Sequence, residues 1–168
     1  MQRILIIGRK GHGKTTFAGF LKQALGDAQT FSTSEYLVHR LALIHGTTEA
    51  KILAAKERYR PEMIVLGNAM CDVDPGCLVS ICLWACHKEC AIIDGIRRVS
   101  EYKRVRKWFE HVLWIERPGI PEGLDNLELT HRHAQEIIVN DGSLADLREK
   151  ARRYAAAIQR PRARRKSR

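Results

Sequence analysis

A glycine-rich stretch near the N-terminus, residues 8–15 with the sequence GRKGHGKT, fits the phosphate-binding pattern G-x-x-x-x-G-K-[ST] without a mismatch. In this P-loop pattern the glycines let backbone N–H groups curl around phosphates, the lysine reaches the β- and γ-phosphates, and the hydroxyl binds Mg²⁺. The pattern therefore predicts binding of a nucleoside triphosphate, taken as ATP, together with Mg²⁺. The residues expected to contact this cofactor are Gly8, Lys10, Gly11, His12, Gly13, Lys14, Thr15 and Thr16.

A second group of candidate residues follows the apolar run 91–93. Asp94 ends this run, and a carboxylate at the end of a strand can hold Mg²⁺, through water, or orient a nucleophile in a P-loop site. Arg97 and Arg98 follow it, and their guanidinium groups match phosphate oxygens. Alternatively, Asp94 is only a turn residue and the two arginines are solvated. However, a P-loop site needs a second carboxylate beside the loop, which Asp94 would supply. We therefore predict that Asp94, Arg97 and Arg98 belong to the catalytic site.

The elements that must position these residues alternate between strands and helices, which predicts an α/β fold with a parallel sheet covered on both faces. Ser32 and Glu35 form a predicted capping box at a helix start. Pro61 is expected to interrupt or close the helix that begins at Glu49. The predicted strands are 4–7, 29–31, 91–94, 112–115 and 137–139, and the predicted helices are 15–25, 36–44, 49–58, 62–68, 77–90, 100–110 and 143–158, with a turn at 72–76 and a polar loop at 116–133.

The length of 168 residues suits one domain, predicted over residues 1–158, with a basic tail over 159–168 that is expected to be disordered. No run of about 18 apolar residues and no secretory signal is visible, so we expect a cytoplasmic protein without a membrane partner. Cys82, Cys86 and Cys90 would share one face of the predicted helix 77–90, near His87. These cysteines could bind a metal or pack in the core. Core packing is favoured, because the paired C-x-x-C spacing of zinc sites is absent.

The net charge of +10, from 29 Lys and Arg against 19 Asp and Glu, favours polyanionic partners and nucleic acid first. Cations gather in the tail and on the predicted helix 100–110, which carries Lys103, Arg104, Arg106 and Lys107. Arg9, Lys10 and His12 add cations within the P-loop that the motif does not require, facing either ATP or a DNA backbone. A solvated, solubilising tail is the alternative interpretation.

Several segments resemble P-loop nucleoside monophosphate kinases. Residues 94–98, DGIRR, are similar to the Asp-Gly-Phe-Pro-Arg segment of adenylate kinases, and residues 31–35, FSTSE, resemble their Ser-Thr-Gly-Asp segment. The second half is more similar to bacteriophage deoxynucleoside monophosphate kinases, through residues 114–119, WIERPG, and 140–144, NDGSL. Related phage kinases phosphorylate the hydroxymethyl group of 5-hydroxymethyluracil in DNA. The resemblance implies a three-layer P-loop NTPase fold with about five parallel strands. In departure from the family, residues 116–134 would form only a minimal lid.

The resemblance also implies roles for single residues. Lys14 would contact the donor phosphates, Thr15 and Asp94 would hold Mg²⁺, and Arg97 or Arg98 would contact phosphates in the transition state. Arg117 would lie over the donor base or phosphates. Residues predicted to bind the acceptor are Glu35, Arg40, Arg60 and Arg98.

Departures from the family shape the predicted reaction. Little sequence lies between Gly46 and Pro61 to form an acceptor-binding insertion, so a large enclosure for a free nucleotide is not expected. A hydroxyl acceptor needs a general base, which Asp94 or Glu35 could supply, with His131 and His133 as further proton carriers.

We therefore predict an ATP-dependent kinase that phosphorylates a deoxynucleotide-type acceptor, favouring the hydroxymethyl group of 5-hydroxymethyl-deoxyuridine within phage DNA, in the host cytoplasm. The alternatives are a free deoxynucleoside monophosphate kinase and a nucleotide-gated, nucleic-acid-binding ATPase. The sequence leaves the oligomeric state open.

Overall fold

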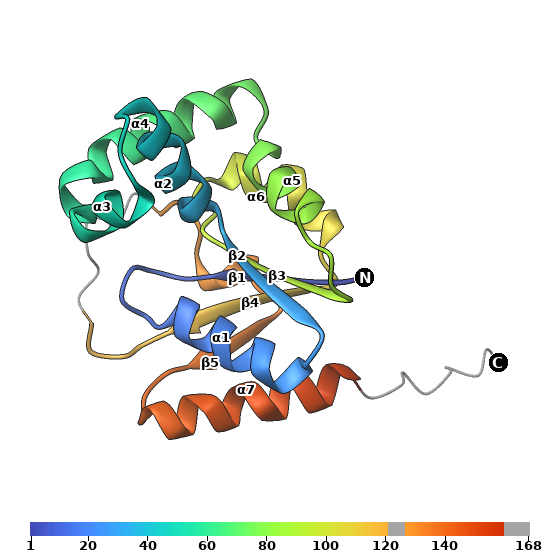
Figure 1. The fold of residues 1–168 in the computed structure, drawn as a ribbon. Coiled ribbons are helices and arrows are strands. Elements are labelled where there is room, and N and C mark those ends of the chain that lie inside the picture. The colour runs from blue at the N-terminus through green and yellow to red at the C-terminus, as the bar shows by residue number, and fades with distance from the viewer. Residues whose placement is uncertain (121–126, 160–168) are drawn as a thin grey trace.

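The computed structural model describes residues 1–120 and 127–159 and is built around a five-stranded parallel sheet (Figure 1). The strands lie in the order β2-β3-β1-β4-β5. Their bounds are β1 Gln2–Ile7, β2 Ala28–Ser32, β3 Cys90–Asp94, β4 His111–Glu116 and β5 Glu136–Val139. The α/β class and the five parallel strands are confirmed.

The helices form layers on both faces of this sheet, with α1 and α7 on one side and the remaining helices on the other (Figure 1). The helices are α1 Lys14–Leu25, α2 Thr33–Ile44, α3 Glu49–Ala54, α4 Lys56–Val73, α5 Cys77–Trp84, α6 Val99–Val105 and α7 Leu144–Gln159, with the short 3-10 turns η1 Arg106–Trp108 and η2 His131–His133. Residues 160–168 of the predicted tail and 121–126 of the predicted lid lie outside the described residues.

Strand β1 shows why both faces are covered. Its side chains alternate between the two faces, as the period of two in a strand requires. Ile4 and Ile6 pack with α1 and α7, while Leu5 and Ile7 pack with α5 and α6. All four are fully or almost fully buried, as expected for a central parallel strand.

Helices α2 to α5 form a separate helical layer with its own apolar cluster. Residues from all four helices contribute to it, including Leu37 of α2, Ile52 of α3, Met63 of α4 and Leu78 of α5. The layer is larger than the short segment between Gly46 and Pro61 indicates, because it also uses residues on both sides of that segment.

Pro61 neither interrupts nor closes a helix, which corrects the prediction for this region. The break falls instead at Ala55, between α3 and α4, and Pro61 lies inside α4. Proline removes one hydrogen bond that would have reached the carbonyl of Glu57, in the first turn of the helix. The helix then continues to Val73, so the predicted turn from Asp72 begins only at Asp74.

The predicted helix 77–90 is also wrong in its second half. Helix α5 ends at Trp84 and Cys90 is the first residue of β3, so Cys82, Cys86 and Cys90 do not share a helix face. Within residues 1–120 and 127–159, no group of three His, Cys, Asp or Glu side chains is arranged to hold a metal ion. Burial raises the pKa of Cys82 to about 12 and that of Cys90 to about 11, which keeps both thiols protonated.

Over the described part of the chain, no single helix is long and apolar enough to cross a membrane, and only α4 and α5 taken together, bent by 93°, meet those two criteria.

Candidate active site

The P-loop connects β1 to α1, as the motif predicts, and its glycines are required by the geometry. Gly8 and Gly13 have φ angles of +146° and +92°. A Cβ atom at Gly8 would lie 2.4 Å from the carbonyl oxygen of Ile115, and one at Gly13 would lie 2.6 Å from Nδ2 of Asn140. Larger residues would therefore push the loop away from β4 and from the segment after β5.

Lys14 begins α1 and crosses the loop. Its Nζ donates a hydrogen bond to the carbonyl oxygen of Arg9, 2.8 Å away. The first turn of α1 contains no acidic residue, so the positive end of the helix dipole and its N–H groups are open to an anion. This arrangement suits the phosphates of ATP.

Asp94 lies beside the loop because β3 pairs directly with β1, with Asp94 opposite Ile6. The Oγ1 of Thr15 donates to Oδ2 of Asp94 at 3.4 Å. Asp94 is only 5% exposed. A hydroxyl and a carboxylate are the hard oxygen ligands that Mg²⁺ prefers, and Mg²⁺ characteristically retains several waters, so this pair fits the ion.

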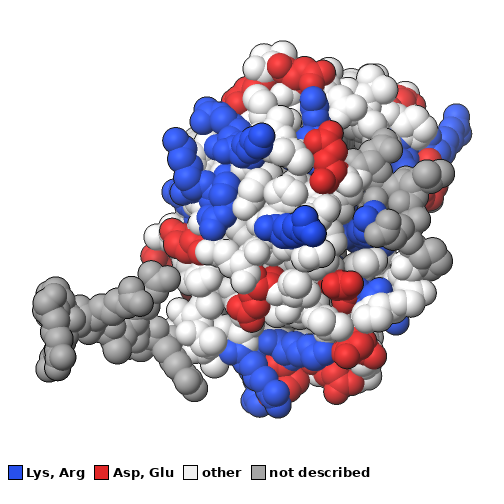
Figure 2. Space-filling view, turned by 180° about the vertical axis from the view of Figure 1, so that it is seen from behind, with Lys and Arg blue, Asp and Glu red and all other residues white. Residues whose placement is uncertain are grey.

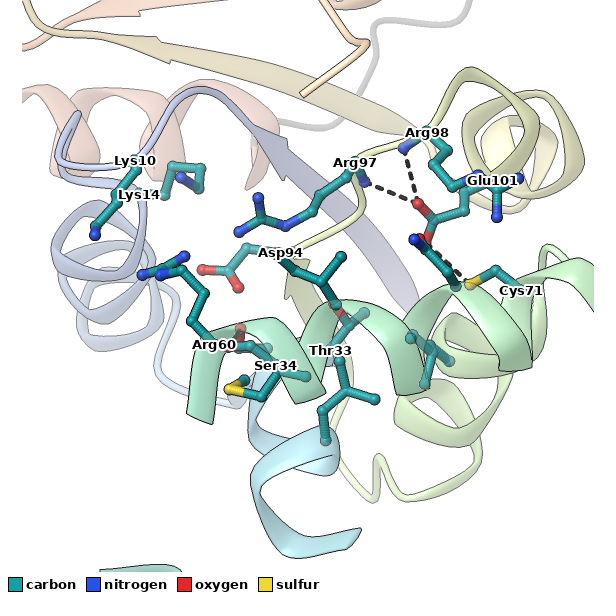
Figure 3. Close-up of a pocket in the computed structure, with 18 of the residues that line it drawn as sticks. Lys10, Lys14, Thr33, Ser34, Arg60, Cys71, Asp94, Arg97, Arg98 and Glu101 are labelled. Atoms are coloured by element: carbon teal, nitrogen blue, oxygen red, sulfur yellow. Dashed lines mark hydrogen bonds between the residues drawn. The ribbon is translucent and has the colours of Figure 1, made fainter. Parts of the chain in front are cut away.

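Cationic side chains from three segments lie around this centre. In Figure 3 the guanidinium groups of Arg97 and Arg60 are directed toward Asp94, and Lys10 and Lys14 lie on the P-loop beside them. Charges converging on one point stabilise negative charge that develops during phosphoryl transfer. The P-loop, α4 and the segment after β3 therefore supply a positive centre with one buried carboxylate.

Glu57 of α4 connects two of these cations. It accepts hydrogen bonds from Arg60 and from Lys10, all at 2.9 Å. The bonds from Arg60 and then from Lys10 lower the pKa of Glu57 to about 2. The carboxylate therefore stays ionised and links α4 to the P-loop.

A cavity of about 680 Å³ opens beside this centre, bounded by the P-loop, α2, α4, α5 and the segment after β3. Its lining combines apolar side chains, such as Leu37, Met63 and Leu78, with polar ones, such as Ser34 and Asn68. The volume falls within the range of small-molecule sites. The sequence did not predict a cavity of this size.

Arg98 and Arg60 both line this cavity, as predicted for acceptor contacts, but they differ in position. Arg60 is directed toward Asp94 (Figure 3). Arg98 is bound to Asp72, with 2.6 Å between Nη1 and Oδ1. The geometry thus separates the two adjacent arginines, with Arg97 directed toward Asp94 and Arg98 paired to the end of α4.

Glu35 and Arg40, predicted in the same acceptor set, are not among the residues that line the cavity. Both are exposed on α2. Glu35 accepts a hydrogen bond from the backbone N of Ser32 at 3.4 Å, so it is the capping-box residue. The face of α2 that carries Leu37 and Leu41 is buried, and helical periodicity turns Glu35 and Arg40 away from it.

His12 does not face ATP or an approaching DNA backbone with its side chain, because the residue is 5% exposed. Its Nδ1 accepts a hydrogen bond from the backbone N of Arg117 at 3.1 Å, and its carbonyl accepts one from Nδ2 of Asn140 at 3.0 Å. Burial lowers the pKa of His12, so the ring is neutral near pH 7. His12 and Asn140 thus tie the P-loop to the segments after β4 and β5.

This burial predicts a pH effect on stability. His12 titrates near 6.5 in the unfolded chain and at a lower pH in the folded one, so the unfolded state binds more protons between the two values. We expect the melting temperature of the wild type to fall as the pH drops through 6.5. The variant His12→Gln, whose amide oxygen can still accept the bond from Arg117, should show a flatter profile in thermal denaturation from pH 7.5 to 5.5. The exposed His39→Gln is the control, and an equal slope in wild type and H12Q would contradict the assignment.

Thr16 and Arg117, the remaining predicted cofactor contacts, are both exposed. Thr16 lies in the first turn of α1, and Arg117 follows β4. His131 and His133, considered as proton carriers, do not line the cavity, and Nδ1 of His133 accepts a bond from the backbone N of Thr130 at 3.0 Å. Proton transfer by these histidines therefore finds no support here.

Glu101 is a cavity residue that the sequence reasoning missed. It is 5% exposed and accepts hydrogen bonds from the backbone N atoms of Arg97 and Arg98, at 2.9 and 2.8 Å (Figure 3). The available signal was a glutamate three residues after Arg98, which is the spacing of a capping box.

No protein-family model matches the sequence, and comparison with curated protein sequences finds no match. Solved structures do match. The crystal structure of shikimate kinase from Aquifex aeolicus is 11% identical, with a TM-score of 0.50, covering 94% of this chain and 98% of that one. The protein TT1252 from Thermus thermophilus is 19% identical, with a TM-score of 0.55, covering 95% of this chain and 98% of that one. The chain therefore has the fold of P-loop kinases.

Proposed function

We propose that this protein is an ATP-dependent kinase whose acceptor is the phosphate group of a free deoxynucleotide-type monophosphate. The observation that carries the proposal is the cavity of about 680 Å³, which joins the P-loop at Lys14 and Thr15 and contains Arg60, Arg97 and Arg98. Its size suits one small molecule, its apolar wall suits a flat ring, and its arginines suit an anion.

The carboxylates of the cavity favour a phosphate acceptor over a hydroxyl. A hydroxyl needs a general base within hydrogen-bond reach, whereas a phosphate is already ionised. Glu57 and Asp72 are engaged by cations, and Glu101 and Glu128 by backbone N–H groups. Asp94 lies against Thr15, where it suits Mg²⁺. Glu35, the other base suggested by the sequence, lies outside the cavity lining.

The proposed chemistry is in-line transfer of the γ-phosphoryl group. Phosphoryl transfer depends mainly on positioning and on stabilising spread negative charge. Lys14 would hold the donor phosphates, Arg97 the transferring group, and Arg60 the acceptor. When bound by Thr15 and Asp94, Mg²⁺ would supply further charge neutralisation at the donor phosphates.

A second candidate acceptor is the hydroxymethyl group of 5-hydroxymethyl-deoxyuridine within DNA. One observation favours it: Lys and Arg side chains gather over α6 and η1 on the face shown in Figure 2. Lys103, Arg104, Arg106 and Lys107 supply this basic face. Such a surface tracks a nucleic-acid backbone without reading sequence.

The test incubates the protein with Mg²⁺ and γ-labelled ATP and offers either a panel of free deoxynucleoside monophosphates or hydroxymethylated DNA. We expect label in nucleoside diphosphates. Label in DNA alone would establish the second candidate, and ATP hydrolysis without any labelled acceptor would leave a nucleotide-gated ATPase.

The basic face gives a separate prediction. If it contacts DNA, Lys103→Glu with Lys107→Glu should weaken binding to duplex DNA by at least about 10-fold and reduce the slope of log affinity against log salt by about 2. Fluorescence anisotropy at several salt concentrations measures both quantities. The control variant makes the same charge reversal elsewhere, with Lys22→Glu on α1 and Lys51→Glu on α3. Equal affinities and slopes for the two double variants would mean that α6 has no special part in DNA binding.

A further inference from the structure

We infer that Glu128 and Glu101 are positioning residues that hold the turn carrying Arg97, and so set where its guanidinium lies. This inference rests on the proposed function, because it assigns Arg97 to the phosphoryl-transfer centre. The evidence is a set of hydrogen bonds to the backbone of residues 97–99 that the kinase pattern in the sequence does not explain.

Glu101 holds the first half of the turn. Its Oε2 accepts from the backbone N of Arg97 at 2.9 Å and of Arg98 at 2.8 Å. Its Oε1 accepts from the thiol of Cys71 in α4 at 3.6 Å. Because Glu101 is 5% exposed, the loss of its carboxylate would leave one buried and two partly buried donors without an acceptor, which costs more than the bonds themselves contribute.

Glu128 holds the second half from another part of the chain. Its carboxylate accepts from the backbone N of Val99 at 2.8 Å, and its own backbone N donates to the carbonyl of Arg97 at 3.0 Å. Three consecutive backbone N–H groups, from residues 97 to 99, therefore end on two carboxylates.

The turn needs this support because it begins at a tightly packed glycine. Gly95 has a φ of +103°, and a Cβ there would lie 2.3 Å from Oγ1 of Thr33. The chain after Gly95 is thus fixed against α2, and the two carboxylates fix it again at residues 97–99. Arg97 has its backbone held at this second point while its guanidinium reaches toward Asp94 (Figure 3).

The position of Arg97 matters because its charge acts only over a short distance on the transferring phosphoryl group. Misplacement of a catalytic group by about 1 Å can cost about 100-fold in rate. If Glu128 acts through Arg97, its removal should lower kcat and leave the KM for ATP nearly unchanged. A purely structural role would instead lower the stability and affect all kinetic parameters alike.

A double-mutant cycle with Glu128→Ala and Arg97→Ala tests the inference. Rates are measured both for phosphoryl transfer and for ATP hydrolysis without acceptor. We expect E128A to lower kcat about 10-fold, R97A about 100-fold, and the double variant to equal R97A. Glu128→Gln should restore most of the rate, because its amide oxygen can accept from Val99. Glu149→Ala on α7 is the control, and Glu101→Gln tests the second carboxylate without emptying its buried site.

The outcomes separate this inference from the proposed function. If the fold-losses of E128A and R97A in the hydrolysis rate multiply in the double variant, the two residues act independently. That result would overturn the positioning role of Glu128. Wild-type hydrolysis without transfer to any acceptor would overturn the proposed function, while the cycle measured on hydrolysis would still decide the positioning role.

Discussion

Lys14→Ala is expected to lower kcat/KM for phosphoryl transfer by about 10²–10³, which corresponds to about 3–4 kcal/mol of transition-state stabilisation. In the P-loop pattern this lysine reaches the β- and γ-phosphates. Its ammonium group lies across the loop, 2.8 Å from the carbonyl oxygen of Arg9, and Lys14 lines the same cavity as Asp94. The loss should affect the chemical step most, because the negative charge is redistributed there.

The fold should tolerate this substitution. Lys14 is only partly buried, and alanine is the best helix former for the first residue of α1. The matched control is Lys22→Ala in the last turn of the same helix, which should keep wild-type activity. Activity is measured with labelled ATP and the best acceptor, and folding by circular dichroism and melting temperature. A folded K14A variant that kept a third of the activity would show that Lys14 does not contact the transferring phosphates.

The donor half of this site was predictable because its parts are local or follow from sheet geometry. Residues 8–15 carry a continuous motif between an apolar strand and an amphipathic helix. Asp94 ends a second apolar run, and the carboxyl ends of neighbouring parallel strands meet at one edge. The structure places these elements side by side through the pairing of β1 with β3.

The residues proposed to bind the acceptor were harder to predict, because one local sequence pattern fits both a helix cap and a site carboxylate. A glutamate three residues after a serine is both a capping residue and a carboxylate near the site, so Glu35 could not be assigned from spacing alone. The buried face of α2 decides this question, and it depends on packing against α3, α4 and α5. Pro61 illustrates the same limit, since tertiary packing outweighs one lost helical hydrogen bond.

Contacts between distant segments could not be read from the sequence at all. Nδ2 of Asn140 reaches the carbonyl of His12 across 128 positions of sequence. The sequence suggested a turn at Asn140 and a cation at His12, and both interpretations treated each residue alone. Only the pairing of β4 with β5 beside β1 brings them together, where burial makes the histidine neutral.

Asp94→Asn is expected to lower kcat by about 10²–10³ and to raise the Mg²⁺ concentration for half-maximal activity by about 10- to 100-fold. The substitution keeps the shape of the side chain but removes the negative charge from a cavity that Lys14, Arg60 and Arg97 also line. The positive charges of these three residues would then repel Mg²⁺ without the Asp94 carboxylate to offset them, so Mg²⁺ would bind more weakly. Activity is measured over a series of Mg²⁺ concentrations at fixed ATP.

Asp72→Asn is the matched control, because it makes the same chemical change in the same cavity, at the ion pair with Arg98. It should leave the Mg²⁺ dependence unchanged and should raise only the KM for the acceptor. The Mg²⁺ series also separates the two roles considered for Asp94. If Asp94 serves Mg²⁺, high Mg²⁺ should restore much of the D94N rate. If it is the general base for a hydroxyl acceptor, the rate should stay low at every Mg²⁺ concentration, and the preference for a phosphate acceptor would be wrong.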